Sequence, residues 1–408
     1  MNRFLLSLFL LSIALILRAD PISDFTASTA VDADNSALLI IDLKSGKKIL
    51  SHNADLPLIP ASIMKSVTIA TLLNKVGHNY EYATPVYLTA PVDDGIVDGN
   101  LLVEASGDPA INTVHDPKSE DFVAEIVAGL KALGVDTIRG KIVVDESKFP
   151  GPSINPTWQK GDLGYAYGTG THGFNFQDNA SGNKSVQKPI ATFRSRLTTS
   201  LSAAGIAIQA LNVEGSDHDF VPVCRHISPT IDEIMRSCMV RSDNQYAEAM
   251  LRLVGATYGD NGSTAEGAAQ LLSFWRQKHA NLKGVKIVDG SGLSRTNRLT
   301  VLFMADMLRI MAKNPYYVSF FPLAGLEGTL KHLLAKTPLE GYLALKTGSM
   351  KGVQCYAGYK LDDDYAPTHI VVVMLNNLPN RAEARRQLDT LLLKTFLPDY
   401  NPEDSKAQ

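Results

Sequence analysis

The sequence predicts an α+β protein in which an antiparallel sheet flanked by helices forms a main domain, with a smaller α/β domain inserted into it. Strand-like apolar runs lie near both ends of the chain, at 36–51 and 343–375, and helical patterns fill much of the region between them. A separate alternation of short strand and helix patterns occupies 85–145. The length of 408 residues suits two or three domains.

Composition and charge exclude several classes of protein. Of the 408 residues 45% are hydrophobic and 20% are charged, which is typical of globular chains rather than disordered, fibrous or coiled-coil ones. The formal net charge of −3 supplies no basic field for nucleic acid or anionic lipid. We therefore expect no nucleic-acid partner.

Residues 1–19 are predicted to be a secretory signal peptide. Arg3 precedes an apolar run from Phe4 to Leu17, which is too short to span a bilayer and matches the hydrophobic region of such signals. Elsewhere the sequence lacks the run of roughly 18 apolar residues expected of a membrane helix. We expect a mature protein outside the cytoplasm without an integral membrane segment, and a peripheral association with the membrane stays open.

The cysteines and histidines indicate no metal or cofactor site. Three cysteines are too few for a disulfide framework, and the sequence does not decide whether Cys224 and Cys238 form a bridge. Neither Cys-x-x-Cys nor His-Glu-x-x-His occurs, and the 9 histidines are scattered. We therefore expect neither a metal ion nor a cofactor.

The first predicted elements belong to the main domain. An apolar run at 36–42, a turn containing Gly46 and a second run from 48 predict an antiparallel hairpin. After two prolines, apolar residues at helical spacing predict a helix from about Ser62 to Val76.

The inserted domain is predicted over 85–214. Short β-prone pieces separated by turns are followed by an amphipathic helix at 121–133 and a strand at 140–145. Residues 149–188 are rich in Gly, Asn, Pro and Ser, which predicts an irregular surface segment, and a helix at 191–204 follows.

The main domain is thus predicted to comprise 20–84 plus 215–400. Its later elements are expected to be helices at 230–257, 265–279 and 299–313, strands at 343–346, 353–360 and 369–375, and a helix at 381–396. The polar tail at 401–408 is expected to be frayed.

The motif from Ser62 to Lys65 can supply a nucleophile and its base. Positions i and i+3 share a helix face, so the Lys65 amine can reach the Ser62 hydroxyl. Lys65 acts as a base only if burial or neighbouring positive charge lowers its pKa. Ser-x-x-Lys occurs three times, but only Ser62 opens an apolar helix. The alternative is that Ser62 is an ordinary helix N-cap.

Two further motifs could complete such a site. Ser242-Asp243-Asn244 lies between two helical patterns, a junction that would project Ser242 and Asn244 into a cleft; the alternative is again an N-cap. Lys346-Thr347-Gly348 occurs once. On an edge strand, the cation and the hydroxyl of this motif could lie beside a carboxylate, and its bare glycine backbone beside an extended peptide. The alternative is a hairpin turn with a solvated lysine.

The order and context of these motifs resemble those of penicillin-binding proteins and class A β-lactamases. Nearly the whole mature chain resembles the D-alanyl-D-alanine carboxypeptidase/endopeptidase family, the class C low-molecular-mass penicillin-binding proteins. The strings that carry this likeness are Gly99–Glu104 with Gly107–Pro109, Ser228–Ile234, Ser242–Glu248, Asp289–Arg295 with Asn297, Gly325–Leu330 and Lys346–Val353.

The resemblance implies a β-lactamase/transpeptidase-like main domain and a periplasmic location. The domain inserted between the first two motifs is shorter than in the best-known members, which insert two domains, and 175–188 looks like the point where the second was lost. Properties of those members that depend on the missing domain are therefore in doubt here.

The resemblance also implies a serine DD-peptidase that cleaves D-Ala-D-Ala termini or D-Ala-diaminopimelate cross-links of peptidoglycan stem peptides and is acylated by β-lactams. Ser62 would be acylated with Lys65 as its base, and Ser242 would relay a proton to the leaving amine. The implied substrate-binding groups are Asn244 for the amide, Lys346 and Thr347 for the terminal carboxylate, Gly348 for close approach, and the backbone N–H groups of Ser62 and Ser349 for the oxyanion.

A diaminopimelate-like side chain would be recognised by residues outside the three motifs. The matching positions are Arg295 and Met350, with Asp162 and Trp158 of the inserted domain as weaker matches. Gln159-Lys160-Gly161 between the last two departs from the family pattern.

Other functions stay open. A β-lactamase needs an added deacylation group, and no Glu-x-x-Leu-Asn motif occurs. A serine esterase would keep Ser62 and Lys65 without needing Lys346 and Thr347. A non-catalytic peptidoglycan-binding protein on this scaffold would be expected to lose Ser62 or Lys65, and both are present. The residues do not decide between carboxypeptidase and endopeptidase, because both cleave the same kind of bond.

Overall fold

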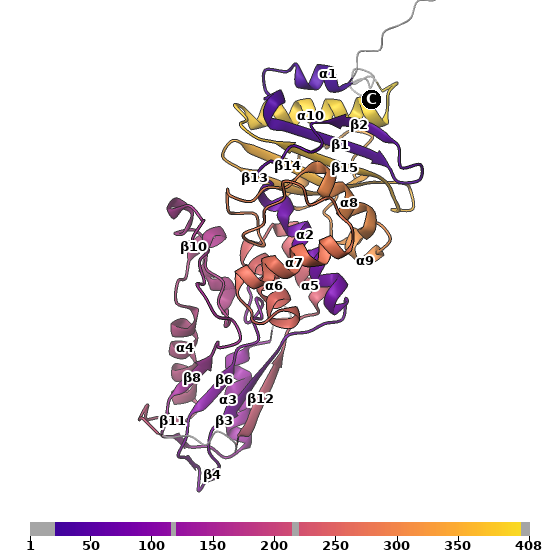
Figure 1. The fold of residues 1–408 in the computed structure, drawn as a ribbon. Helices are drawn as coiled ribbons and strands as arrows, with labels where there is room; N and C mark the ends of the chain where they lie inside the picture. Colours follow the sequence, from indigo (N-terminus) through magenta and orange to yellow (C-terminus); the bar gives the residue numbers. More distant parts are fainter. Residues whose placement is uncertain (1–20, 116–119, 214–219, 401–408) are drawn as a thin grey trace, which may run out of the picture.

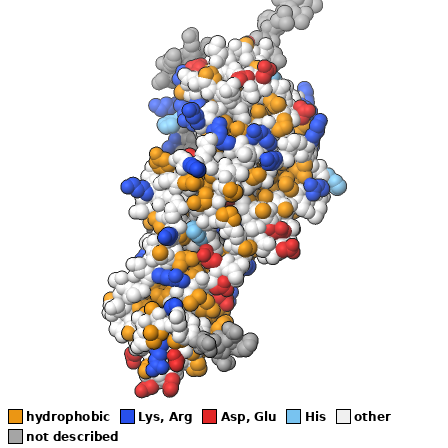
Figure 2. All heavy atoms as spheres, turned by 60° about the vertical axis from the view of Figure 1, so that its left-hand side comes forward, with side chains coloured by type: hydrophobic (Ala, Val, Ile, Leu, Met, Phe, Trp, Pro, Cys, Tyr) orange, Lys and Arg blue, Asp and Glu red, His pale blue; other side chains and the backbone are white. Residues whose placement is uncertain are grey.

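The computed structural model describes residues 21–115, 120–213 and 220–400. The predicted signal peptide and polar tail lie outside these ranges. Figure 1 shows an elongated molecule with a large sheet at one end, a layer of helices in the middle and the inserted unit at the other end. In Figure 2, Lys and Arg side chains lie scattered over the upper, sheet-containing half of the face shown, and acidic and basic side chains mix at the lower tip.

The large sheet joins the two ends of the chain. Its order is β13-β14-β15-β1-β2, and all its neighbours are antiparallel. The strands are β1 (Ser36–Asp42), β2 (Lys48–His52), β13 (Leu343–Met350), β14 (Val353–Leu361) and β15 (Pro367–Leu375). This sheet, flanked by helices, confirms the predicted fold class.

Strand β13 is longer than the sequence predicts. We expected a strand at 343–346, but β13 continues to Met350 because residues up to the pair Met350 and Val353 stay in register with β14. The Lys346-Thr347-Gly348 motif therefore lies inside a strand rather than at its end. This strand is at the edge of the sheet, as predicted.

The two faces of the large sheet pack against different layers. Leu38 and Ile40 pack in one apolar cluster with Leu388 and Leu392 of α10 (Arg381–Phe396), and α1 (Pro21–Thr26) joins the same layer. The alternate residues of β1 pack in the cluster of the helical layer. This alternation is the period of two expected for a strand covered on both sides.

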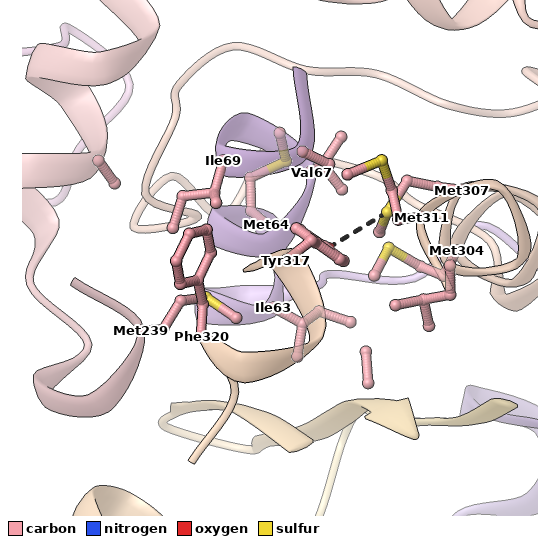
Figure 3. Packing of buried hydrophobic residues seen from close by; sticks show 14 of the residues in the cluster. Ile63, Met64, Val67, Ile69, Met239, Met304, Met307, Met311, Tyr317 and Phe320 are labelled. Atoms are coloured by element: carbon pink, nitrogen blue, oxygen red, sulfur yellow. Dashed lines mark hydrogen bonds between the residues drawn. The ribbon is translucent and has the colours of Figure 1, made fainter. Parts of the chain in front are cut away.

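Helix α2 (Met64–Val76) lies at the centre of the helical layer. Ten of its 13 residues are buried, and Figure 3 shows Met64 and Val67 among apolar side chains that include Met307 and Met311. Around it lie α5 (Ile231–Arg241), α6 (Asn244–Tyr258), α7 (Thr264–Gln277), α8 (Val301–Met311) and α9 (Pro315–Ser319). The helix that carries Lys65 is thus fixed by packing on all sides.

Among its described residues, the inserted unit has two four-stranded sheets and the helices α3 and α4. One sheet has the order β12-β3-β6-β8 and the other β11-β7-β5-β4. The elements are β3 (Ala83–Leu88), β4 (Val92–Asp93), β5 (Ile96–Val97), β6 (Leu101–Glu104), α3 (Phe122–Ala132), β7 (Thr137–Ile138), β8 (Ile142–Asp145), α4 (Pro189–Ala203), β11 (Ala207–Ile208) and β12 (Val221–Ile227).

One sheet of the inserted unit extends beyond the range 85–214 predicted for this domain. β12 pairs antiparallel with β3, with Val221 opposite Leu88 and Ile227 opposite Ala83, so the sheet of the unit spans 83–227. Pro222 and Arg225 interrupt the apolar alternation of β12. For that reason the sequence pattern did not reveal this strand.

The irregular segment 149–188 runs back toward the helical layer. It holds the turns η3 (Lys160–Asp162), η4 (Ala166–Gly168) and η5 (Gln177–Asn179) and the hairpin β9 (Ala180–Ser181) and β10 (Lys184–Ser185). Arg252 of α6 is buried and donates to the carbonyl oxygens of Thr171 (2.6 Å) and Phe149. These bonds anchor the segment to the helix that follows the Ser-x-Asn motif.

Candidate active site

The Ser62 motif lies where the chain enters helix α2. The turn η2 (Ala61–Ile63) leads into the helix, and the Lys65 ammonium donates to the Ser62 hydroxyl at 2.9 Å. Ile63, not Ser62, occupies the N-cap position of α2. The helix-cap alternative for Ser62 is therefore wrong, and the predicted pairing of Ser62 with Lys65 is present.

Two glycines hold this turn from opposite sides. A Cβ atom on Gly348 would lie 2.6 Å from the Pro60 carbonyl oxygen, and one on Gly292 would lie 1.9 Å from the Ala61 oxygen. Ala61 itself has φ 46°, a left-handed conformation that is costly for a residue with a side chain. Gly348 was predicted to leave room for a substrate, and here it also lets β13 approach the serine turn.

Lys65 is fully buried, and every hydrogen-bond donor direction of its ammonium is used. Besides Ser62 it donates to Asn244 Oδ1 (2.5 Å) and to the Ser291 carbonyl oxygen (2.8 Å). Burial lowers the pKa of Lys65, and the Cys238 thiol and nearby carboxylates, Asp243 first among them, oppose part of that shift. The predicted condition for a lysine base is thus met.

Ser242 stands at the break between α5 and α6. Its φ of 61° and ψ of 41° are left-handed, which ends α5. Asp243 then caps α6 by accepting from the Tyr246 N–H at 3.0 Å, so capping applies to Asp243 and leaves the Ser242 hydroxyl free to face the site. The Lys346 ammonium donates to that hydroxyl at 2.9 Å.

Asn244 connects the lysine base to the inserted unit. While its Oδ1 accepts from Lys65, its Nδ2 donates to the Tyr167 carbonyl oxygen at 2.7 Å. Tyr167 belongs to η4 in the irregular segment. The inserted unit therefore contacts the Ser-x-Asn motif directly through Tyr167, a contact that the sequence did not predict.

Lys346 is fully buried on β13, so the alternative of a solvated lysine in a turn is wrong. It donates to Ser242 and to the Thr347 carbonyl oxygen (2.8 Å). Burial and the charge of Lys65 together hold the pKa of Lys346 well below its ordinary value. The neighbouring Thr347 hydroxyl lies 2.6 Å from that of Thr329.

Two buried carboxylates shape the loop whose carbonyl binds Lys65. Glu248 accepts from the N–H groups of Gly290 (3.0 Å) and Ser291 (2.8 Å). Asp289 accepts from the Trp158 indole N–H at 2.9 Å, which accounts for the burial of Trp158. Burial raises the pKa of Glu248 to about 7. The sequence signal for both acids was only their presence in the strings that carried the family likeness.

Two cavities open on either side of Ser62 and Ser242. We call the first the inserted-unit cavity; it has a volume of about 620 Å³, and its walls include Asn244, Arg295, Met350, Lys351, Tyr167 and Asp162. It thus brings together Asp162, Arg295 and Met350 as the resemblance implied, whereas Trp158 packs behind it on Asp289.

We call the second the α10 cavity. Its volume is about 470 Å³, and besides the two serines its walls include Thr329, Leu333, Thr347, Ser349, Gln354, Tyr356, Arg381 and Arg385. Arg381 lines both cavities and donates to the Ser349 hydroxyl. Neither arginine was a candidate from the sequence, because their helix is distant in the chain from all three motifs.

The cysteines form no bridge in this structure. Cys224 lies on β12 of the inserted unit and Cys238 is buried on α5, and both are free, as is Cys355. The question that the sequence left open is thereby answered for this conformation.

Comparison with known proteins finds similarity over most of the chain. The model of the D-Ala-D-Ala carboxypeptidase 3 (S13) family matches residues 19–184 and 176–395. The two matched segments meet within 175–188, the stretch where the sequence indicated a lost domain. The D-alanyl-D-alanine carboxypeptidase of Actinomadura sp. strain R39 is 25% identical over 81% of this chain and 76% of its own length.

Solved structures show the same fold. Penicillin binding protein 4 from Haemophilus influenzae superposes with a TM-score of 0.79 at 20% identity, covering 91% of this chain and 98% of the other. The same protein complexed with a β-lactam gives a TM-score of 0.73 at 21% identity, covering 92% and 99%.

Proposed function

The chain belongs to the D-Ala-D-Ala carboxypeptidase 3 (S13) family, and from that premise we propose which residues carry its reaction. It is a serine DD-peptidase that acts on peptidoglycan. The observation that carries the proposal is the 2.9 Å hydrogen bond from buried Lys65 to Ser62. A neutral Lys65 amine can accept the serine proton as the serine oxygen attacks.

Acylation begins with that proton transfer. The Ser62 oxygen attacks the carbonyl carbon of the penultimate D-Ala while its proton passes to Lys65 Nζ. The resulting oxyanion is bound by the backbone N–H groups of Ser62 and Ser349, which the packing of Gly348 on the serine turn brings close. The close approach of Gly348, on which a Cβ atom would lie 3.0 Å from the Ser62 nitrogen, supports this pair of donors.

The leaving amine takes its proton from Ser242. Collapse of the tetrahedral intermediate breaks the C–N bond, and the Ser242 hydroxyl gives its proton to the nitrogen. Ser242 is replenished from Lys346, which already donates to it at 2.9 Å. The proton that Lys65 took from Ser62 returns by way of Ser242 to Lys346, which leaves Lys65 neutral again. Asn244 holds the substrate amide, and water then hydrolyses the acyl-enzyme with Lys65 as base.

The substrate carboxylate binds beside Lys346 and Thr347. Burial and the charge of Lys65 lower the pKa of Lys346, and no carboxylate is among the described groups that act on it. An incoming carboxylate supplies a negative charge, so substrate binding favours the protonated lysine that Ser242 needs as proton source.

The inserted-unit cavity fits the free end of a diaminopimelate-like side chain. Such an end carries both an ammonium and a carboxylate, and the cavity offers Asp162 for the first and Arg295 for the second, with Met350 as an apolar wall. Arg295 is oriented by donating to the Lys351 carbonyl oxygen at 3.1 Å.

β-Lactams are expected to acylate the same serine. The H. influenzae structure complexed with a β-lactam supports this expectation through its shared fold. We also propose a periplasmic location, which rests on the predicted signal peptide and the family. Among the helices of the described residues, none combines the length and the apolar character needed to span a bilayer.

The test is intact-mass analysis of the mature protein after incubation with benzylpenicillin, followed by product analysis on a cross-linked muropeptide. We expect an adduct of one penicilloyl unit that is absent in Ser62→Ala and retained in Ser45→Ala, since Ser45 lies in an exposed turn with the same Ser-x-x-Lys spacing. Folded protein with neither adduct nor cleavage would refute the proposal. Rapid loss of the adduct with consumption of penicillin would indicate a β-lactamase instead.

A further inference from the structure

The α10 cavity reaches beyond the groups that hold one carboxylate. Ser62, Ser242 and Thr347 line its inner part, and the first two turns of α10 contribute Arg381 and Arg385 to the same cavity. A D-Ala leaving group consists of one methyl, one amine and one carboxylate. The volume of about 470 Å³ is much more than such a group fills.

The charge of this cavity has one sign. Among its described lining residues, Arg381 and Arg385 are the ionised side chains, and no Asp or Glu belongs to the wall. Arg381 donates to Ser349, whose hydroxyl lies 3.1 Å from Gln354 Oε1, so neutral groups hold it in place. The inserted-unit cavity, by contrast, includes the carboxylate of Asp162.

Arg385 keeps its charge available to the cavity. The acid that it influences is Asp389, one turn further along α10, which accepts from the Leu334 N–H at 3.2 Å. Among the described residues Arg385 forms no ion pair, and its charge only slightly offsets the burial that raises the pKa of Asp389 to about 6. The adjacent Arg386 differs, because it forms an ion pair with Glu383 and does not line the cavity.

The position of the cavity identifies what enters it. Ser242 and Thr347 are the groups assigned to the leaving amine and its carboxylate, so the α10 cavity lies on the leaving-group side of the scissile bond. The guanidinium group binds carboxylates through a planar pair of donors. A leaving group that extends past Thr347 and carries a second carboxylate therefore matches the wall.

We propose that the α10 cavity is a subsite for peptide leaving groups that carry a second carboxylate, with Arg381 and Arg385 as the residues that bind it. A stem peptide released from a D-Ala-diaminopimelate cross-link has this chemistry, whereas free D-Ala does not. The inference rests on the proposed function, and it assigns the protein an endopeptidase preference.

The test compares two substrates and one chemical modification. The kcat/KM of a pentapeptide muropeptide, which releases D-Ala, is measured beside that of a cross-linked dimer. A third substrate is a dimer whose leaving stem peptide has every carboxyl amidated except the one next to the leaving amine, which Lys346 and Thr347 bind. In the wild type we expect amidation to lower kcat/KM of the dimer about tenfold or more. In Arg385→Gln we expect the ratio of kcat/KM for the dimer to kcat/KM for the pentapeptide to fall by about the same factor. Amidation of the dimer should then lower kcat/KM of this variant little further.

The controls separate this inference from the proposed function. Arg386→Gln should keep the wild-type dimer-to-pentapeptide ratio of kcat/KM. Arg385→Lys retains the charge but not the planar pair of donors, so it should give an intermediate ratio. Equal losses on both substrates, or the same amidation effect in Arg385→Gln as in the wild type, would overturn the inference. Normal penicilloyl adducts on Ser62 in that case would leave the proposed function intact, whereas no adduct in the wild type would refute the proposed function itself.

Discussion

Lys65 and Lys346 are both buried in the active site, yet their surroundings differ. Lys65 sits in the helical layer, where it donates to three oxygens and where the carboxylates of Asp243, Asp289 and Glu248 support its charge. Lys346 sits on the edge strand, where the charge of Lys65 opposes its own. Among the described residues, the carboxylates that act on Lys65 have no counterpart around Lys346.

This difference indicates a division of labour. The surroundings of Lys65 are complete before substrate arrives, so it can exchange one proton with Ser62 in every turnover. The surroundings of Lys346 lack a negative charge that the substrate carboxylate brings. In the proposed mechanism, Lys65 therefore serves the chemical step, and Lys346 serves substrate recognition coupled to proton supply.

The largest effect is expected for Lys65→Met, which removes the base and preserves an unbranched apolar side chain. Acylation by benzylpenicillin, by a pentapeptide and by a carboxylate-free ester should all fall by about 10³-fold or more. The rates are measured by adduct formation and product release. Retention of peptide cleavage at a tenth of the wild-type rate would show that Lys65 is not the base.

A smaller and selective effect is expected for Lys346→Met. Because the substrate carboxylate loses its partner, kcat/KM for the pentapeptide should fall about ten- to hundredfold, while the carboxylate-free ester should lose far less. The ratio of the two substrates is the measurement. If kcat/KM fell equally for the pentapeptide and the ester, Lys346 would act in the chemical step for both substrates. The proposed difference in role between Lys65 and Lys346 would then be wrong.

The pH dependence of acylation should respond to the charges around Lys65. Asp243→Asn keeps a residue that can cap α6 but removes a carboxylate that raises the pKa of Lys65. The pKa of Lys65 should fall, so the acid limb of the acylation rate against pH should move to lower pH by roughly one unit or less.

An exposed acid provides the control for that experiment. Asp98→Asn removes a carboxylate at the surface of the inserted unit, where it pairs with Arg139, and should leave the profile unchanged. A shift of the acid limb to higher pH in Asp243→Asn would contradict the sign.

The smallest effect on activity is expected at Asp108, a buried charge in the inserted unit with no place in the reaction. Its Oδ2 has no hydrogen-bond partner among the described residues, and burial raises its pKa to about 6 from 3.8. Its protonated form therefore fits the fold, so its contribution to stability is present below about pH 4 and is lost as pH rises through 6.

Asp108→Asn should accordingly raise the melting temperature at pH 8, by an amount corresponding to at most about 3 kcal/mol in the free energy of unfolding. At pH 3.5 the melting temperature should stay nearly unchanged. Calorimetry at the two pH values measures this, and penicillin acylation should stay at the wild-type rate. A lower melting temperature at pH 8 would show that the carboxylate is needed.

Local patterns predicted much of the fold. The apolar runs of β1 and β15 and the helical pattern of α10 predicted these elements nearly to the residue. β12 was missed because Pro222 disturbs its pattern and its partner strand lies far away in the sequence. The extension of β13 was missed because pairing with β14, rather than its own residues, sustains it.

In the site, too, features set by local sequence could be predicted, and contacts between distant segments could not. Spacing within one helix turn predicted that Lys65 reaches Ser62, and motif order predicted that Ser242 and Lys346 share the site. The Tyr167 carbonyl could not be predicted, since any residue type supplies one and only the course of the irregular segment brings it to Asn244. Arg385 is one of three nearby arginines on α10, and packing alone decides which faces the cavity.

The edge of the large sheet has a consequence for solubility. An open edge strand can template aggregation by pairing with any extended chain. Here Leu323 pairs with Ala344, and the Leu345 N–H donates to the Pro322 carbonyl oxygen at 3.1 Å, so a loop covers the first half of β13. The uncovered part, residues 347–350, is long enough for the stem peptide that we propose to bind there. It is too short for the strand of another protein, which typically spans about five or six residues. The enzyme can thus keep this edge open for its substrate with little risk of self-association through β13.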